Sequence, residues 1–536
     1  MSNTNIGHWS AVLVLVFFFI SSEDKRRHYL HLNFITVPFF SFLVLLAAGA
    51  IDGKVVHDGI VGANGVKPLD IMALFISLAY LSISLDATGL LRFLAFWVVQ
   101  KGGSSGRRLF TALYVFFLLC GVIVGNDPVI LSGTAFLAYL TRVSGITNPT
   151  AWIFSQFAAA NMASVVLVSS NPTNLVLSGA FSLSFTTYTA HCILPFLGAA
   201  VVVYPVLILG LFRSAELIPS SIDLNITETE DIRETLIDRT GAIFGSILLL
   251  ITLGVLVGTS TIGISVWEVT VPPAIIMLLR DTYHDWSRRP HPSQDGYRAS
   301  ISSGLQEDLN HAVQPNRMSN KPQIELQGLP ARLSSRPSLE TLSQAEPEAL
   351  LPLAERYWAR FSFTFPTVTA IAKRLPFPLL PFAFLMFILV QGLSSQGWVE
   401  LFARWWAAWV HRTGLLGAIG GMGFLACMFC NVCGTNIGAT ILLARVIQLW
   451  ASNDGPVDVR TKEGAIYALA LGSNYGAFTL TFSASLAGLL WHRILQQKGI
   501  HVRPRQFLML NLPISIIAMT CSAAILLAQI YVIHGQ

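Results

Sequence analysis

Long uncharged stretches divide the chain into segments that can cross a lipid bilayer. Asp, Glu, Lys and Arg are absent from 143–212, 240–267, 375–399, 413–444, 464–492 and 506–536. A crossing needs about 20 mainly apolar residues. Because lipid offers the backbone no hydrogen-bond partner, such segments form helices or a closed barrel, and the chain lacks the short alternating strands of a barrel. The pattern predicts an all-α polytopic membrane protein.

The spacing of the apolar stretches predicts the individual elements. We expect crossings near 8–22, 30–51, 69–86, 188–212, 240–257, 264–280, 376–397 and 506–532. Between them lie amphipathic stretches at 87–100 and 399–411, interrupted apolar units at 109–141 and 413–447, and long units with polar breaks at 150–182 and 463–492. The same order of elements therefore occurs twice.

This internal repetition predicts two inverted repeats with re-entrant hairpins and broken helices, an arrangement typical of secondary transporters. Asn161 and Asn474 occupy matching places, because each follows a helix of small residues and precedes a polar break. The predicted parts are N-terminal membrane helices (1–68), repeat 1 (69–212), a connecting loop with a two-helix hairpin (213–280), a disordered cytoplasmic loop (281–374) and repeat 2 (375–536).

Composition supports a membrane location. The chain is 53% hydrophobic and only 12% charged, whereas soluble domains carry roughly a quarter charged residues. The net charge of +5 fits basic cytoplasmic loops better than nucleic-acid binding. When each interrupted unit is threaded as a hairpin, most basic residues fall inside, together with the polar loop at 281–374. That loop has too few apolar clusters to fold on its own.

The first interrupted unit breaks at Gly125-Asn126-Asp127-Pro128. Proline removes a backbone donor and disfavours helix in the residue before it. A carboxylate at this depth is expensive and usually functional, so Asp127 is a candidate ligand for a coupling cation. The alternative is a cap for a helix that begins at Pro128, and one residue could serve both roles.

The second break, in the long unit of the first repeat, offers the polar side chains of Ser170, Asn171, Thr173 and Asn174. The helix that follows presents its N-terminus, which attracts anions. Carbonyls freed by the break can hold a cation. The alternative is a proline kink at Pro172 that nearby hydroxyls satisfy.

Mirrored candidates occur in the second repeat. They are Asn431, Gly434, Thr435 and Asn436 in the hairpin, and Thr481, Ser483 and Ser485 in the long unit. Gly434 permits close approach of the backbone. The hydroxyl groups could instead join helices by hydrogen bonds alone. With Asn126, Asp127, Asn161 and Asn474, these residues complete the predicted binding site for substrate and ion.

Three cysteines in the second hairpin share one helical face, because Cys427, Cys430 and Cys433 are spaced by three. Three thiolates would suit a soft metal or metalloid. Cysteines in apolar helices are more often small packing residues, and a structural zinc site needs four ligands. We therefore predict no metal site.

Several stretches resemble the arsenite permease family of the ion-transporter superfamily, which also contains divalent anion/sodium symporters and some sodium/proton antiporters and shares a citrate transporter-like domain. The stretches are 84–89, 125–127, 472–476 and 485–491. The resemblance implies a scaffold part and a moving transport part, with hairpin tips at 126–128 and 431–436 and helix breaks at 170–174 and 479–485. Similar arsenite permeases carry an acid where this chain has Asn161 and Asn474. An amide cannot release a proton, so proton coupling through these positions is not expected.

The sequence as a whole predicts a secondary active transporter of a small anion or oxyacid, such as an arsenite-like solute, an inorganic anion or a carboxylate like citrate. We expect coupling to Na⁺ or H⁺, no cofactor, and partners limited to the solute, the bilayer and a possible homodimer. A sodium/proton antiporter on the same scaffold is the alternative. A signalling scaffold acting through 281–374 is another class. A membrane enzyme is disfavoured, since no metal triad, Ser/His/Asp set or phosphate loop occurs.

Overall fold

The computed structural model describes residues 35–63, 66–222, 235–259, 264, 266–288, 353–453 and 457–534. Throughout these residues the regular elements are helices, and seven of the described helices are long and apolar enough to cross a membrane. The predicted all-α polytopic membrane fold is confirmed. The predicted crossing at 8–22 lies outside the described residues.

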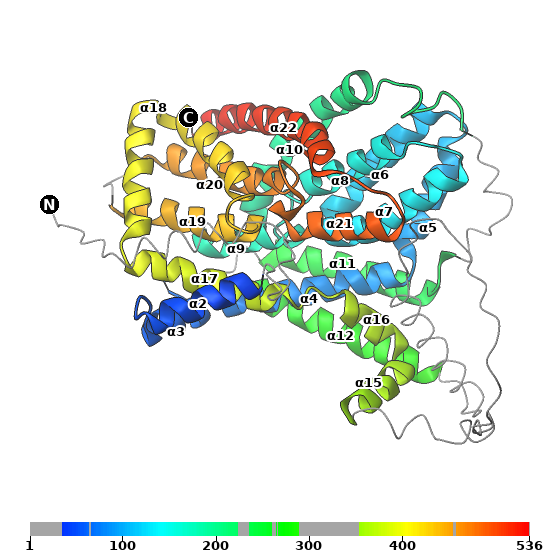
Figure 1. Ribbon diagram of the computed structural model, residues 1–536, viewed down its shortest axis with the longest axis horizontal. Helices are drawn as coiled ribbons and strands as arrows, with labels where there is room; N and C mark the ends of the chain where they lie inside the picture. Colours follow the sequence, from blue (N-terminus) through cyan, green and yellow to red (C-terminus); the bar gives the residue numbers. More distant parts are fainter. Residues whose placement is uncertain are drawn as a thin grey trace, which may run out of the picture. The chain divides into compact units, whose positions relative to one another are not determined.

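Repeat 1 follows the predicted order (Figure 1). Its helices are α4 (Pro68–Ala87), α5 (Leu90–Gly102), the hairpin α6 (Gly106–Ile123) and α7 (Asn126–Val143), the broken helix α8 (Thr150–Ala163), η1 (Val168–Ser170) and α9 (Pro172–Phe181), and α10 (Phe185–Pro205), which continues as the π-helical η2 (Val206–Leu211). Proline opens both α4 and α9, where a missing N–H costs no helical hydrogen bond.

Repeat 2 has the same plan. It contains α17 (Leu379–Ser395), α18 (Trp398–Phe429), α19 (Asn436–Asn453), the broken helix α20 (Val459–Gly476), η6 (Phe482–Ala484) and α21 (Leu486–Gln497), and α22 (Pro504–Ile533). Helix α18 is kinked at Gly414, whose φ of 61° is not helical. The segment before Gly414 matches α5, and the segment after it matches α6.

Local detail supports the repetition. Gly89 precedes α5 and Gly397 precedes α18, and both adopt left-handed backbone with φ of 86° and 78°. Only glycine takes this conformation without steric cost. The same turn thus redirects the chain at the same place in each repeat.

The two repeats pack on each other reciprocally (Figure 1). Within each repeat, α6 contacts α8 and α18 contacts α20. Between repeats, α9 packs on α19 and α21 packs on α7. The second half of each broken helix therefore lies against the hairpin of the other repeat. Such exchange is expected of two repeats related by a two-fold axis.

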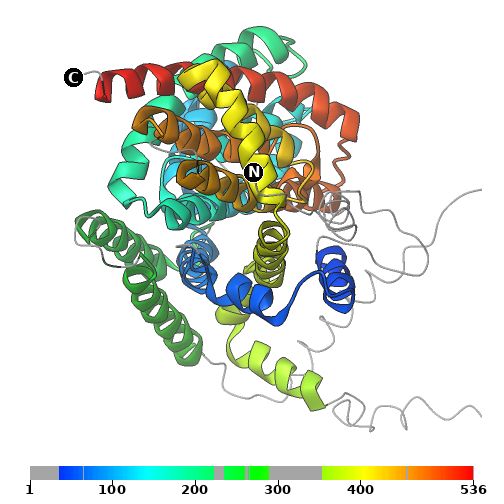
Figure 2. The ribbon, with the colours of Figure 1, turned by 90° about the vertical axis from the view of Figure 1, so that its left-hand side faces the viewer.

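The crossing predicted at 30–51 is described only from residue 35 onward. Its described part is a short helix, α2 (Thr36–Ala47, 12 residues, about 18 Å long), followed by α3 (Gly53–Val61). The apolar run therefore does not continue as one helix to residue 51. The chain turns at Gly49, where φ is 68°. Asp52 then caps α3 by accepting from the Val55 N–H at 2.8 Å. Figure 2 shows these two blue helices as separate elements.

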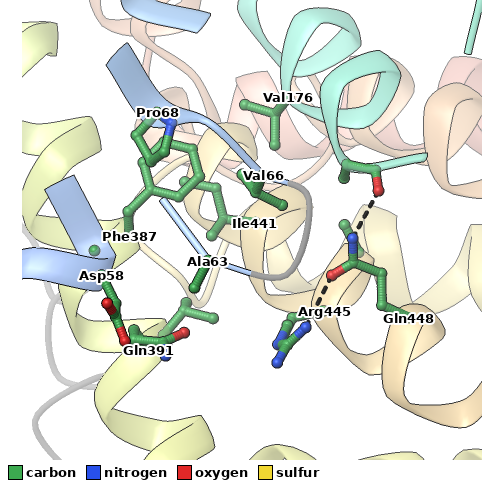
Figure 3. Close-up of a pocket in the computed structure, with 14 residues that line it drawn as sticks. Asp58, Ala63, Val66, Pro68, Val176, Phe387, Gln391, Ile441, Arg445 and Gln448 are labelled. Atoms are coloured by element: carbon green, nitrogen blue, oxygen red, sulfur yellow. Dashed lines mark hydrogen bonds between the residues drawn. The ribbon is translucent and has the colours of Figure 1, made fainter. Parts of the chain in front are cut away.

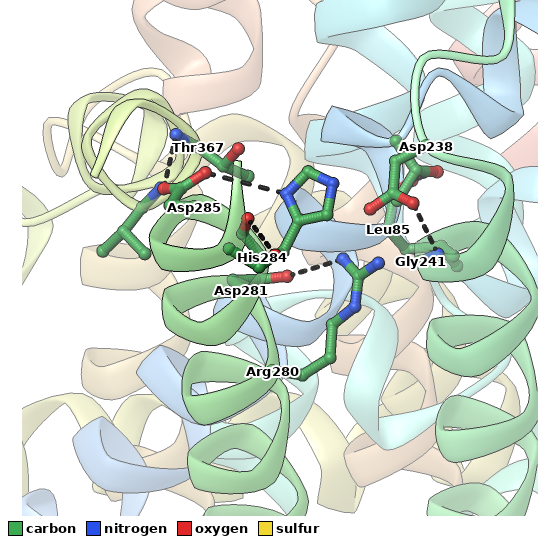
Figure 4. Close-up of polar contacts among 11 residues, drawn as sticks. Leu85, Asp238, Gly241, Arg280, Asp281, His284, Asp285 and Thr367 are labelled. Carbon is green, nitrogen blue, oxygen red and sulfur yellow. Dashed lines mark hydrogen bonds and ion pairs between the residues drawn. The ribbon is translucent and has the colours of Figure 1, made fainter. Parts of the chain in front are cut away.

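The remaining helices connect the repeats. They are α11 (Arg239–Thr259), α12 (Val266–Ser287), α15 (Leu353–Thr364) and α16 (Pro366–Arg374). The chain divides into two compact units, one of 1–278 with 374–536 and one of 279–373. In the first unit, Asp238 caps α11 through the Gly241 N–H at 2.9 Å (Figure 4).

In the second unit, Asp285 at the end of α12 caps α16. One of its carboxylate oxygens accepts from the backbone N–H groups of Thr367 at 2.8 Å and Val368 at 3.1 Å (Figure 4). Disorder was predicted for all of 281–374. That prediction fails at both margins, where α12, α15 and α16 are helical. Residues 289–352 lie outside the described part of the chain.

Candidate functional site

The tip of the first hairpin rests on the break of the first broken helix. Gly125 links α6 to α7 with a φ of 93°, and a Cβ atom there would lie 2.8 Å from the Ser170 carbonyl oxygen. The Ser170 hydroxyl in turn donates to the Val122 carbonyl at 2.6 Å. Only glycine permits this contact. The predicted breaks at 125–128 and 170–174 are therefore in direct contact.

Asp127 lies in the first turn of α7 and does not cap it. The helix begins at Asn126, two residues earlier than predicted, and its N-cap is Gly125, which has no side chain. The half-buried Asp127 carboxylate makes no hydrogen bond or ion pair to any described residue. The capping interpretation is thus not supported, and the carboxylate is available to a ligand.

Asp127 lines a cavity of about 40 Å³. Its polar wall comes from Asn126, Ser169, Ser170 and Asn171, and helix α4 supplies an opposing wall that includes Ser82. The N-termini of α7 and α9 both open onto this space. Helix N-termini favour anions, whereas a carboxylate favours cations. The combination suits an anion and a cation bound side by side.

The first break is stabilised mainly by its own amides. Asn171 caps α9, since its Oδ1 accepts from the Thr173 N–H at 3.1 Å and the Thr173 hydroxyl at 3.0 Å. Asn174 donates to the carbonyls of Ser164 at 2.6 Å and Leu167 at 2.8 Å. These carbonyls are among those freed by the break. Both carbonyls already accept hydrogen bonds from Asn174. A cation bound at the break would therefore have to be held by other carbonyls, on the side that faces Asp127.

The two broken helices meet at Asn474. Its amide nitrogen donates to Oδ1 of Asn174 at 2.8 Å, and its oxygen accepts from the Ser164 hydroxyl at 2.9 Å. All three residues are completely buried. Polar side chains from both repeats are thereby joined in one network at the centre of the fold.

Asn161 and Asn474 have equivalent positions, as the sequence predicted. Each donates to the carbonyl four residues earlier, Phe157 or Ala470, at 2.9 Å. Their outer contacts differ. Asn161 accepts from Asn126 at 3.4 Å within its own repeat, whereas Asn474 reaches across to the other repeat. The hydrogen bond from Asn126 thus connects the tip of the first hairpin to the buried amide of Asn161.

The second break is built by Asn431 and two threonines. Asn431 donates to the Thr479 hydroxyl at 2.8 Å and accepts from the Thr481 N–H at 3.1 Å. The hydroxyls of Thr481 and Ser483 lie 3.0 Å apart, and Ser485 caps α21 through the Gly488 N–H at 3.0 Å. Thr481, which precedes η6, is exposed, whereas Leu167, at the same place before η1, is half-buried. The caps Asn171 and Ser485 are both buried, so the two breaks differ in exposure only at their start.

The tip of the second hairpin holds an unsatisfied hydroxyl. Thr435 is fully buried, and its Oγ1 has no hydrogen-bond partner in the described part of the chain. It lies between Gly434, with a φ of 78°, and Asn436, the first residue of α19. A buried polar group without a partner costs about 1–3 kcal/mol. A bound solute or water would remove this cost.

The cysteines of the second hairpin pack against α20. The thiols of Cys427 and Cys430 point to the carbonyls of Gly472 at 3.4 Å and Ser473 at 3.6 Å. Among the described residues, no group of three His, Cys, Asp or Glu side chains could hold a metal ion. The thiols of Cys427 and Cys430 are buried against α20.

A second polar cavity was missed by the sequence interpretation (Figure 3). It measures about 40 Å³ and lies between α3, α9, α17 and α19, with Asp58, Gln391, Arg445 and Gln448 as its polar lining. Arg445 donates to the Gln448 side chain at 3.2 Å, but its Nε has no partner among the described residues. The available signal was the single charge of Arg445 directly after the uncharged stretch 413–444.

Comparison with known proteins follows the same division into halves. A family model described as Citrate transporter (CitMHS) matches residues 11–289, which is more than half of the 536 residues. The chain belongs to the citrate transporter family. A second family model, Arsenical pump membrane protein (ArsB), matches 362–532, so the resemblance to arsenite permeases is also confirmed. This citrate transporter family member is an integral, multi-pass membrane protein.

Individual similar proteins are also membrane pumps or transporters by name. An arsenical pump membrane protein of Escherichia coli is 28% identical over 232 residues, covering 42% of this chain and 52% of the relative, so the match spans about half of that protein. One from Yersinia enterocolitica is 23% identical over 85% of this chain and 86% of its own length. The crystal structure of the Alcanivorax borkumensis YdaH transporter superposes with a TM-score of 0.51 at 13% identity, over 99% of both chains. That structure supports the transporter fold.

Proposed function

We propose that this protein is a secondary active transporter that moves a small anion or oxyacid by alternating access, coupled to Na⁺ or H⁺. The observation that carries the proposal is the buried junction of Asn474 with Asn174 and Ser164, at 2.8 and 2.9 Å. In this junction the breaks of the two broken helices lie beside each other. Transporters bind their solute where such broken helices meet.

In this proposal the cavity beside Asp127 holds the coupling cation next to the solute. The Asp127 carboxylate supplies the negative charge, and the N-terminus of α7 supplies N–H donors for the anion. Neutralisation of each ion by the other makes joint binding more favourable than separate binding. This is the physical basis of coupling that we infer.

A difference in exposure at the start of the two breaks supports a state that is open on one side. Thr481 in the second break is exposed, whereas its counterpart Leu167 in the first break is half-buried. Inverted repeats can exchange their conformations. The opposite state would then bury the second break and open the first.

Arg445 favours a charged solute over an uncharged oxyacid. The guanidinium borders a cavity next to α9 and α19 and presents an unpaired Nε among the described residues. Arginine binds carboxylates through paired N–H donors. A carboxylate such as citrate is therefore the substrate class that we propose first, and arsenite, suggested by the names of the relatives, comes second.

Flux in reconstituted vesicles tests this function. Purified protein is supplied with labelled citrate, shorter carboxylates, phosphate or arsenite, with and without Na⁺ and pH gradients. We expect uptake of a carboxylate that one of the two gradients accelerates. Absence of flux for every anion, with either gradient, would contradict the proposal.

A sodium/proton antiporter is the second candidate, because the Asp127 carboxylate has no partner among the described residues. An exposed route to such a carboxylate could serve cations alone. The same vesicles separate the two functions. Na⁺ exchange driven by a pH gradient in the absence of any transported anion would favour the antiporter.

A further inference from the structure

A second cavity of the first repeat lies where α4 begins, at the membrane surface. It measures about 350 Å³, which is within the range of ligand sites. The first two turns of α4, the second half of α9, the end of α11 and the start of α12 surround it. Lys67 and Ser182 in its lining are exposed, so this outer cavity opens at the surface of the molecule.

The outer cavity and the Asp127 cavity lie along the same face of α4. Positions 67, 70, 71 and 74 line the outer cavity, and positions 75, 78, 79, 82 and 83 line the inner one. Steps of three and four residues keep side chains on one face of a helix. Helix α9 packs on α4, and its positions 175, 178 and 179 follow the outer cavity with the same steps. The two cavities are therefore successive parts of one groove between α4 and α9.

Apolar side chains close this groove at its middle. Leu175 borders both cavities, whereas Leu74 borders the outer one and Phe75 the inner one. These three residues are only 3%, 6% and 5% exposed. Polar groups lie on either side of them, with Asp70 in the outer cavity and Asp127 in the inner one. An apolar constriction between two polar spaces offers water no partners and blocks charged solutes.

We propose that this groove is the path by which the solute reaches the Asp127 cavity from the side of the membrane where α4 begins, and that Leu175 closes the path in this conformation. The inference rests on the proposed transport function and adds the path and its barrier. A leucine that only filled the core would border no cavity, whereas Leu175 borders two.

The position of Leu175 on the broken helix explains how the path could open. Helix α9 begins at Pro172, and Leu175 lies one turn further on. A shift of α9 along α4 would carry Leu175 away from Leu74 and Phe75 and join the two cavities. The barrier thus belongs to the same element that carries the first break, so opening of the path and rearrangement of the site would occur together.

Labelling of introduced cysteines tests the path. The background is Cys521→Ser, because the other five cysteines are buried. Leu183→Cys and Thr259→Cys report on the outer cavity, and Ala79→Cys reports on the inner one. A membrane-impermeant methanethiosulfonate is added to right-side-out and to inside-out membrane vesicles. We expect both outer cysteines to react from the same side, and Ala79→Cys to react about tenfold more slowly from that side.

Shortening Leu175 tests the barrier. From the side on which the outer cysteines react, Leu175→Ala should speed labelling of Ala79→Cys about tenfold without changing that of Leu183→Cys. Leu175→Val, a milder change that keeps the fold, should give a smaller increase. Leu177→Ala is the matched control, because Leu177 lies on the same helix, has no exposed surface and lines neither cavity. It should change neither rate.

Equal labelling of Ala79→Cys with Leu175→Ala and with Leu177→Ala would overturn the barrier. Outer cysteines that react from opposite sides, or from neither, would overturn the path. Labelling needs no flux, so the two proposals fail separately. Absence of flux with the expected labelling would contradict the transport function and leave the groove and its barrier in place. Retained flux with unchanged labelling would contradict this path alone.

Discussion

The amide nitrogen of Asn474 donates to Oδ1 of Asn174 at 2.8 Å, so one hydrogen bond joins the broken helices of both repeats. The two residues are 300 positions apart in the chain. Neither has any exposed surface. The hydrogen bond pairs a donor of Asn474 with an acceptor of Asn174. It explains how two amide side chains can be buried at the centre of an apolar fold.

Replacing Asn474 with Ala should lower both stability and transport. The change removes a donor to Asn174 Oδ1 and one acceptor of the Ser164 hydroxyl, which keeps the Asn161 carbonyl as its other acceptor. Loss of the partner of a buried polar group costs about 1–3 kcal/mol. Thermal unfolding in detergent measures the loss. Asn511→Leu is the control, since Asn511 is equally buried but has no hydrogen-bond partner among the described residues. Equal loss in both variants would contradict the role of the junction.

Gly125→Ala should abolish transport. The added Cβ would lie 2.8 Å from the Ser170 carbonyl oxygen, and the φ of 93° is strained for alanine. The hairpin tip must then move away from the break. Gly145→Ala provides the comparison, because Gly145 also has a positive φ of 67° but open space around it. We expect flux to be lost in the first variant and retained in the second.

Arg445→Gln should raise KM for an anionic substrate and leave kcat nearly unchanged. Such a split indicates loss of binding that is equal in ground and transition states. Arg445→Lys should recover only part of the affinity, since lysine lacks the planar fork of donors. Arg412→Gln, which removes an exposed arginine, is the control. An unchanged KM in Arg445→Gln would remove this residue from solute capture.

Arg374→Gln should lower the thermal unfolding temperature. Arg374 pairs at 3.3 Å with Asp86, whose side chain is 2% exposed and also accepts from Ser132 on α7. Because Arg374 itself is 41% exposed, water offsets part of the loss, and we expect about 1–3 kcal/mol. Lys67→Gln breaks an exposed pair with Asp70 at 3.9 Å and should have little effect.

The repeated order of elements could be predicted because apolar length and polar interruptions are local properties of the sequence. The breaks beside Pro128 and Pro172 were located for the same reason. The division of α2 from α3 was missed, since the apolar run continues past Gly49 and its left-handed turn leaves no hydropathy signal.

Partner choice within the site could not be predicted from sequence. Asn474 and Asn161 have the same local surroundings, yet only Asn474 reaches the other repeat. That difference arises from how the repeats pack, as does the position of Arg445 beside α9. Long-range packing of this kind has no periodic pattern that a single sequence displays.

Gradient-driven uptake tests whether Asp127 couples a cation to the solute. Uptake is measured in vesicles with wild-type protein and with Asp127→Asn, which keeps the shape of the side chain and breaks no hydrogen bond or ion pair to a described residue. We predict that the wild type responds to a Na⁺ or pH gradient and that the variant, though folded, does not. The same gradient dependence in both proteins would contradict coupling through this carboxylate.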